Sequence, residues 1–158
     1  MRVTVLCVGK LKEDWQKAGC HEYLKRLTRY GKFEVREVPD CPEPAKPSPA
    51  LDNQVIREEG RAILRQLHPD DYVIALAIDA EAPDSLTLAR KLAAWSMDGR
   101  PVVLVIGGSL GLSEEVLARA DARLSFSRLT FPHPLMRVIL LEQLYRACKI
   151  LAGERYHK

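Results

Sequence analysis

The sequence predicts an α/β protein in which a mostly parallel sheet is flanked by helices, folded as a single domain over residues 1–158. Three observations carry this prediction. Short apolar runs alternate with segments of helical periodicity along the whole chain, which is typical of a parallel sheet with crossover helices. The length of 158 residues suits one domain with a sizeable core. The sequence contains no internal repeat that would indicate a repeat architecture instead.

The first half of the chain is expected to supply two strands and two helices. Residues 3–8 are apolar and rich in valine, as in a buried strand, and residues 33–38 form the second strand. The helix expected over 12–30 places these apolar residues near one face: Trp15, Ala18, Tyr23, Leu24 and Leu27. Residues 39–50 contain five prolines and predict an irregular loop. The next helix is marked by Val55, Ile56, Ile63, Leu64 and Leu67.

The second half repeats the alternation three times. Strands are expected over 72–78, 101–106 and 123–129. Helices are expected over 85–97, 113–120 and 134–152. Because parallel strands end at one edge of their sheet, the loops after Ile78, Ile106 and Leu129 should lie together. We therefore expect one composite ligand site near 76–81, 107–111 and 126–134.

The last of these helices is apolar around nearly its whole circumference. Such a helix must be buried on all sides, and the sheet covers only one of them. A second subunit is expected to cover the rest, which predicts a homodimer. Glu142 and Arg146 are spaced i,i+4 on this helix, and the sequence leaves open a surface pair, an interface contact or a substrate contact.

The run Gly107-Gly-Ser-Leu-Gly111 follows the strand expected at 101–106 and is compatible with two roles. Glycines let a ligand approach bare backbone N–H groups, which favours a cofactor loop. The same run also suits a plain strand-to-helix turn with Ser113 as the helix N-cap. It lacks the glycine spacing of a dinucleotide fingerprint and the Lys-Ser/Thr pair of a phosphate-binding P-loop.

Composition narrows the functional class. The chain carries a net charge of +3, which permits nucleic acid as a partner without requiring it. Cys7, Cys20, Cys41 and Cys148 form no Cys-x-x-Cys pair and have no clustered histidines, so no metal site is expected. No apolar run approaches the roughly 20 residues of a membrane span, and no signal peptide is recognisable. These features predict a cytoplasmic protein without a membrane partner.

Taken together, several short motifs resemble the RlmH-type ribosomal RNA large-subunit methyltransferases of the SPOUT class. The residues that carry the resemblance are Val8-Gly-Lys10, Trp15, Ile106-Gly-Gly-x-x-Gly-Leu-Ser113, Leu129-Thr-Phe-Pro-His-Pro134, Leu144-Tyr-Arg-Ala147 and Tyr156-His157. The resemblance implies a C-terminal trefoil knot and a homodimer. It also implies S-adenosylmethionine as cofactor and methylation of N3 of a pseudouridine in 23S ribosomal RNA of the assembled ribosome.

Site residues follow from the same resemblance, position by position. The implied cofactor-binding residues are Leu76, Gly107, Gly108, Phe126, Ser127, Arg128, Leu129, Thr130 and Phe131. For catalysis, His157 is the first choice as general base and His133 the second, although a structural role for His133 carries equal weight. Tyr156 is expected to stack on the target base, and Arg146 to bind phosphate or stabilise charge on the ring.

Two positions depart from the family pattern. The family usually has Pro-Glu where this chain has Ser109-Leu110, so an acidic side chain near the cofactor is missing. Lys158 replaces the arginine usual after Tyr156-His157 and lacks its planar fork. Two rival interpretations therefore stay open, namely an inactive RNA- or ribosome-binding protein of the same fold and a SPOUT enzyme that acts on transfer RNA.

Overall fold

A five-stranded sheet forms the centre of the structure, a computed structural model that describes residues 1–97 and 99–158. The strands lie side by side in the order β2-β1-β4-β3-β5, and every pairing between them is parallel. Their bounds are β1 (Arg2–Val8), β2 (Lys32–Val38), β3 (Tyr72–Leu76), β4 (Val102–Ile106) and β5 (Ala122–Leu124). The α/β class and the parallel sheet predicted from the sequence are confirmed.

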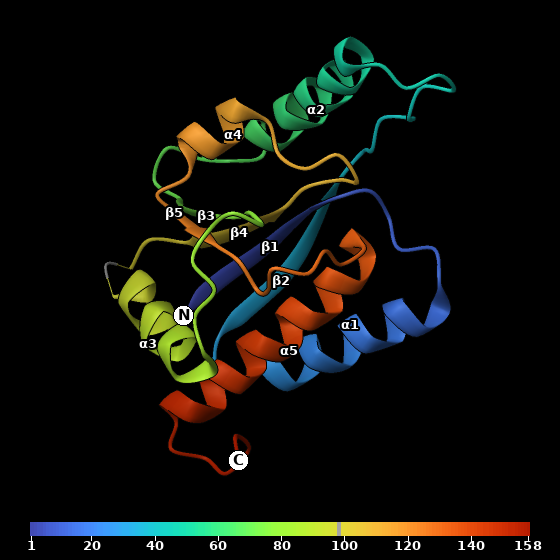
Figure 1. The fold of residues 1–158 in the computed structure, drawn as a ribbon. Coiled ribbons are helices and arrows are strands. Elements are labelled where there is room, and N and C mark those ends of the chain that lie inside the picture. The colour runs from blue at the N-terminus through green and yellow to red at the C-terminus, as the bar shows by residue number, and fades with distance from the viewer. Residues whose placement is uncertain (98) are drawn as a thin grey trace.

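Helices cover both faces of this sheet, so the molecule has three layers (Figure 1). The helices are α1 (Asp14–Leu27), α2 (Pro49–Leu64), α3 (Ser85–Ser96), α4 (Glu114–Arg119) and α5 (His133–Leu151). Helices α1, α3 and α5 lie on one face, and α2 and α4 lie on the other. Covering both faces explains why the inner strands β3 and β4 are continuous apolar runs, whereas the edge strand β2 alternates apolar and charged residues.

Side-chain alternation along β1 divides the core into two parts. Val3, Val5 and Cys7 point into the cluster under α1, α3 and α5, whereas Leu6 and Val8 point into the cluster under α2 and α4. Successive side chains of a strand face opposite sides, so one strand contributes to both clusters. A slip of one residue in its register would exchange the two sets.

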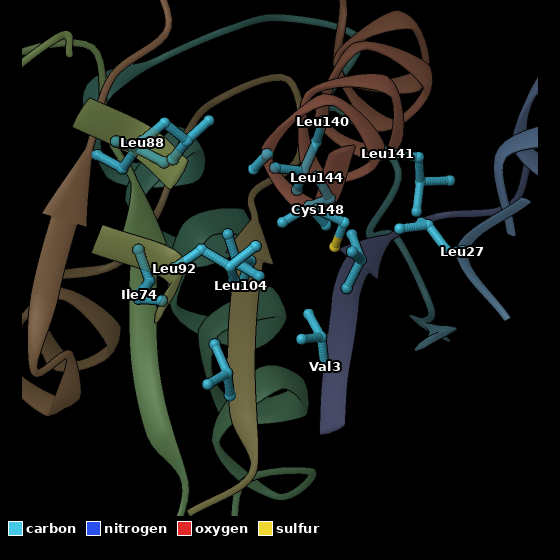
Figure 2. Packing of buried hydrophobic residues seen from close by; sticks show 14 of the residues in the cluster. Val3, Leu27, Ile74, Leu88, Leu92, Leu104, Leu140, Leu141, Leu144 and Cys148 are labelled. Carbon is cyan, nitrogen blue, oxygen red and sulfur yellow. The ribbon is translucent and has the colours of Figure 1, made fainter. Parts of the chain in front are cut away.

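Helix α5 lies in the middle of its layer, between α1 and α3 (Figure 1). In Figure 2, Leu140, Leu144 and Cys148 lie over the sheet residues Val3 and Leu104, with Leu88 and Leu92 of α3 beside them. On the other flank α1 approaches closely, because a Cβ on Gly19 would lie 3.1 Å from Val138 Cγ1. The sheet and two neighbouring helices thus bury more of α5 than the sequence suggested.

The apolar face predicted for α1 is partly wrong. Trp15 is 57% exposed and Ala18 is exposed, whereas Gln16 and Cys20 are buried. The buried positions 16, 20 and 27, with the partly buried position 23, follow the spacing of one helical stripe. Trp15 lies about 100° away from that stripe, so its aromatic side chain points towards solvent.

The strand predicted over 123–129 is much shorter than expected. β5 ends at Leu124, and the chain then forms turns closed by its own serines. Ser125 Oγ donates to the Ser127 carbonyl at 3.0 Å, and Leu129 N–H donates to Ser127 Oγ at 3.0 Å. Such local side-chain hydrogen bonds compete with a strand ladder, and they release residues 125–132 as a loop.

The part of the chain that the structure describes shows neither a membrane-spanning helix nor a cluster of metal ligands. None of its helices combines the length and apolar character that crossing a bilayer requires. No three His, Cys, Asp or Glu side chains among residues 1–97 and 99–158 gather as metal ligands.

Candidate active site

A cavity of about 730 Å³ lies at the carboxyl ends of β3, β4 and β5, where the sequence placed the composite site. This size is within the usual range for sites that bind small molecules and cofactors. Nearly all the predicted cofactor residues line it, with Arg128 the exception. They are Leu76, Gly107, Gly108, Phe126, Ser127, Leu129, Thr130 and Phe131. Among them Leu129 is 71% exposed, so it presents a large apolar surface at the cavity rim.

The glycine loop, residues 107–111, forms one wall of this cavity and folds back on itself. Gly111 N–H donates to the Gly108 carbonyl at 3.1 Å, and Gly111 has a positive φ of 90°. A Cβ on Gly107 would lie 2.9 Å from the carbonyl carbon and oxygen of Gly111. A Cβ on Gly108 would lie 2.5 Å from Glu59 Oε2. The loop's own packing therefore requires Gly107, and Gly108 leaves room for the Glu59 carboxyl group of α2. Both reasons differ from the close cofactor approach inferred from the sequence.

The glycine loop leads directly into a helix, so the strand-to-helix turn considered for it is present, while the cofactor role stays a prediction. Ser113 is the N-cap of α4, and its Oγ accepts from Val116 N–H at 3.3 Å. Glu114 and Glu115 follow in the first turn, where acidic side chains favour the positive helix end.

A second cavity, of about 460 Å³, shares a wall with the first. Leu124, Ser125, Phe126 and Phe131 line both cavities. The far side of the second cavity is formed by Asp84, Ser85, Gln143 and His157. His133 lines the first cavity and His157 the second, so the two candidate bases lie on different sides of one wall.

Comparisons with known proteins agree over the whole chain. A family model described as "Predicted SPOUT methyltransferase" matches residues 1–157. The chain belongs to the SPOUT methyltransferase family. Proteins named "Ribosomal RNA large subunit methyltransferase H" from Alkaliphilus oremlandii (strain OhILAs) and Carboxydothermus hydrogenoformans (strain ATCC BAA-161 / DSM 6008 / Z-2901) are each 48% identical over 159 residues. In both cases the match covers 100% of this chain and 100% of the relative.

A solved structure supports the fold of this SPOUT methyltransferase. A crystal structure described as a "Probable Methyltransferase" from Bordetella pertussis Tohama I superposes with a TM-score of 0.52 at 16% identity. The superposition covers 93% of this chain and 94% of that one. The five-stranded parallel sheet and its flanking helices agree with the SPOUT class. The C-terminal trefoil knot implied by the family resemblance stays a prediction.

His133 is the first residue of α5 and is held between Pro132 and Pro134. Burial lowers the pKa of its imidazole, Arg137 lowers it further, and Asp40 partly opposes both. The positive N-terminal end of α5 acts in the same direction. A lowered pKa keeps the imidazole neutral near pH 7, and a neutral imidazole can accept a proton.

The lowered pKa of His133 predicts an acid-dependent loss of stability. Because the folded-state pKa lies below the unfolded value, the contribution of His133 is complete above pH 6.5 and is lost as pH falls through the folded pKa. His133→Gln should therefore lose less stability than the wild type between pH 7 and pH 5. Urea unfolding at both pH values measures the difference, with exposed His21→Gln as the control. Equal losses in all three proteins would contradict this assignment.

Chain ends are usually poorly ordered unless other groups hold them, and the C-terminal tail, residues 155–158, is held through Tyr156. Its hydroxyl donates to Glu142 Oε1 at 3.1 Å, and its ring meets Tyr145 edge-on at 5.0 Å between centroids. Arg146 pairs with the same Glu142 at 2.6 Å and lies 4.7 Å from the Tyr156 ring centre. Burial and the Glu142 carboxylate raise the pKa of Tyr156 to about 12, so its hydroxyl stays protonated and donates.

These contacts answer part of the question whether Glu142 and Arg146 form a surface pair, an interface contact or a substrate contact. The pair is partly buried on α5, and it holds the tail against the helix. Arg146 and Tyr156 line neither cavity, whereas their neighbour His157 lines the second. Of the predicted catalytic residues, the structure thus brings only His133 and His157 to the cavities.

Ser109, one of the departures from the family pattern, contacts a carboxylate from another segment. Its Oγ donates to Glu43 Oε1, which belongs to the proline-rich stretch before α2. An acidic side chain is therefore present beside the glycine loop even though Leu110 replaces the usual glutamate. Sequence reasoning missed it because residue 43 lies 66 positions from its partner.

Arg137 was also missed. It is 2% exposed, pairs with Glu37 Oε1 at 2.5 Å and donates to the Gly9 carbonyl at 2.9 Å. These contacts fix the first turn of α5, including His133, to the carboxyl ends of β1 and β2. One signal was available, because an arginine flanked by apolar residues on a buried helix needs a specific partner.

Proposed function

We propose that this SPOUT methyltransferase transfers a methyl group from S-adenosylmethionine to N3 of a pseudouridine in large-subunit ribosomal RNA. The substrate is the assembled ribosome, and the place is the cytoplasm. The observation that carries the proposal is full-length identity of 48% to proteins named ribosomal RNA large subunit methyltransferase H. The position of the main cavity at the carboxyl edge of β3, β4 and β5 supports it.

The cavity residues fit S-adenosylmethionine. The exposed Leu129 and the partly buried Leu76 offer apolar surface for the adenine ring, and the 126–131 loop offers backbone groups to its edge. The folded-back glycine loop closes one side, where Gly107 and Gly108 present backbone and Leu110 adds apolar surface. When bound, the sulfonium group supplies an electrophilic methyl group, so alignment with the acceptor nitrogen is the main task of the protein.

The residues around the cavities divide the remaining work. N3 of the target base carries a proton, and His133 is a neutral acceptor at the wall of the first cavity. His157 lies across the shared wall in the second cavity, and release of the tail from α5 would let it reach an RNA base. Arg146 and Tyr156 hold this tail on α5 until RNA competes for them.

The deciding experiment is incubation with ribosomes that lack the modification and with methyl-labelled S-adenosylmethionine, followed by nucleotide mapping. We expect label at N3 of a single pseudouridine of 23S ribosomal RNA. Ribosome binding without methyl transfer would favour the inactive RNA-binding alternative. Label on transfer RNA, with none on ribosomes, would favour the other rival.

The functional unit is proposed to be a homodimer, and this gives a hydrodynamic prediction. Helix α5 keeps Met136, Ile139 and Ile150 partly exposed even after packing against α1 and α3. An interface over this helix should bury on the order of 1,200–2,000 Å² in total. Sedimentation at low micromolar concentration should give about twice the chain mass of 17.8 kDa. A monomer that methylates ribosomes at full rate would contradict the dimer.

A further inference from the structure

Glu59 of α2 carries a buried carboxyl group that takes no part in the proposed reaction. It is 5% exposed, although glutamate is almost never buried without partners. Its Oε1 accepts from Cys41 N–H at 3.1 Å. Its Oε2 is shielded from solvent and has no hydrogen-bond partner among the described residues. An unpaired buried oxygen carries a desolvation cost, so its retention needs an explanation.

The unpaired oxygen faces the glycine loop. A Cβ on Gly108 would lie 2.5 Å from Oε2, so the carboxyl group packs directly on the backbone of that residue. Glu59 does not line the cavity, whereas Gly108 does. The carboxyl group therefore supports the cavity wall from behind. Gly60, next to Glu59, lets Ser113 approach α2 closely. Helix α2 therefore also packs against the residue that follows the glycine loop and caps α4.

The proline-rich stretch before α2 completes the support. Cys41 N–H reaches Glu59, and Glu43 reaches Ser109 of the glycine loop. Glu59 thus connects α2, this stretch and the glycine loop at one buried point. Removing the Glu59 side chain would leave the Cys41 N–H without its acceptor and would open a void behind the glycine loop.

We propose that Glu59 is a positioning residue, which fixes the conformation of residues 107–111 and thereby sets the affinity for the methyl donor. The effect on affinity for the methyl donor rests on the proposed function. The effect on the loop conformation does not, because a supported loop protects its amides from exchange whether or not a ligand is present.

Charge explains how the carboxyl group is tolerated in this place. Burial raises the pKa of Glu59, and the carboxylates of Asp40 and Glu43 raise it further, against the lowering effect of Cys41 N–H. The glycine loop itself contributes no titratable side chain. Protonation gives a neutral acid that keeps Oε1 as an acceptor for Cys41. Rising pH ionises the group, so its support of the loop should weaken as pH rises through the folded-state pKa.

The test compares Glu59→Ala and Glu59→Gln with Glu58→Gln, which changes the neighbouring exposed glutamate of the same helix turn. Hydrogen exchange of the ligand-free proteins is measured at 107–112, and S-adenosylmethionine affinity is measured by calorimetry. We expect Glu59→Ala to exchange faster at these amides and to bind about tenfold more weakly, which corresponds to 1.4 kcal/mol. Glu58→Gln should match the wild type in both measurements.

Glu59→Gln separates positioning from charge, because it keeps the shape and the acceptor but cannot ionise. We expect it to restore loop protection and affinity, and the ratio of wild-type affinity to Glu59→Gln affinity to fall as pH rises. Unchanged exchange at 107–112 in Glu59→Ala would overturn the proposal, as would a Gln variant as defective as the Ala variant. Should Glu59→Ala fail to fold, a pH-independent ratio for the Gln variant would still overturn it.

The outcomes also distinguish this inference from the proposed function. If the wild type binds S-adenosylmethionine and Glu59→Ala binds it equally well, the role of Glu59 is wrong and the proposed function stands. If the wild type binds no S-adenosylmethionine, the proposed function fails, and hydrogen exchange alone decides whether Glu59 supports the loop.

Discussion

Removal of residues 156–158 is expected to reduce methyl transfer at least about 100-fold while cofactor affinity and dimerisation stay unchanged. Loss of a general base typically costs 10²–10⁴-fold, and the deletion removes His157, one of the two candidate bases, together with the aromatic ring of Tyr156. The deletion lies outside both core clusters, so the fold should be retained. Single-turnover methylation of unmodified ribosomes measures the effect directly.

Point variants apportion the effect of this deletion. His157→Gln removes the imidazole alone, and Tyr156→Phe removes the bond to Glu142 while keeping the ring. His21→Gln, an exposed histidine of α1, serves as the matched control and should leave the rate unchanged. A deleted protein within about threefold of the full-length rate, under 1 kcal/mol of transition-state stabilisation, would remove the tail from the mechanism.

Gly107→Val is expected to weaken S-adenosylmethionine binding at least about 100-fold, or about 2.7 kcal/mol. The reason is internal to the loop, because the new Cβ would lie 2.9 Å from the backbone of Gly111 and 3.1 Å from Leu112 Cδ2. Backbone at that distance has to move, and residues 107–111 form one wall of the cavity. Calorimetry measures the affinity, and thermal unfolding checks that the sheet is intact.

Ser109→Ala is the control within the same loop. It removes only the contact to Glu43 and leaves the backbone free of overlap, so it should weaken binding far less than Gly107→Val. Unchanged affinity in a folded Gly107→Val protein would show that the cofactor does not depend on this wall. The proposed cofactor site would then have to be abandoned.

Much of the candidate site could be predicted from the sequence, because its parts are local. Gly107 and Gly108 follow a buried strand, and the loop after the fifth strand is contiguous in the chain. The boundary of that strand could not be predicted, since Ser125 and Ser127 end it through hydrogen bonds that apolar periodicity does not register. Trp15 was misplaced for a similar reason, because its apolar character says nothing about the phase of α1.

By itself the sequence determined the element order, the parallel sheet and the edge at which the cavity lies, because apolar periodicity and the rule for parallel strands act through neighbouring residues. Only the tertiary structure decided what supports that cavity. Glu59 meets Gly108, Glu43 meets Ser109, and Arg137 meets Glu37 across a separation of 100 positions. Such contacts depend on how layers pack, and burial makes an unpaired carboxyl or guanidinium costly enough that only the folded arrangement reveals its partner.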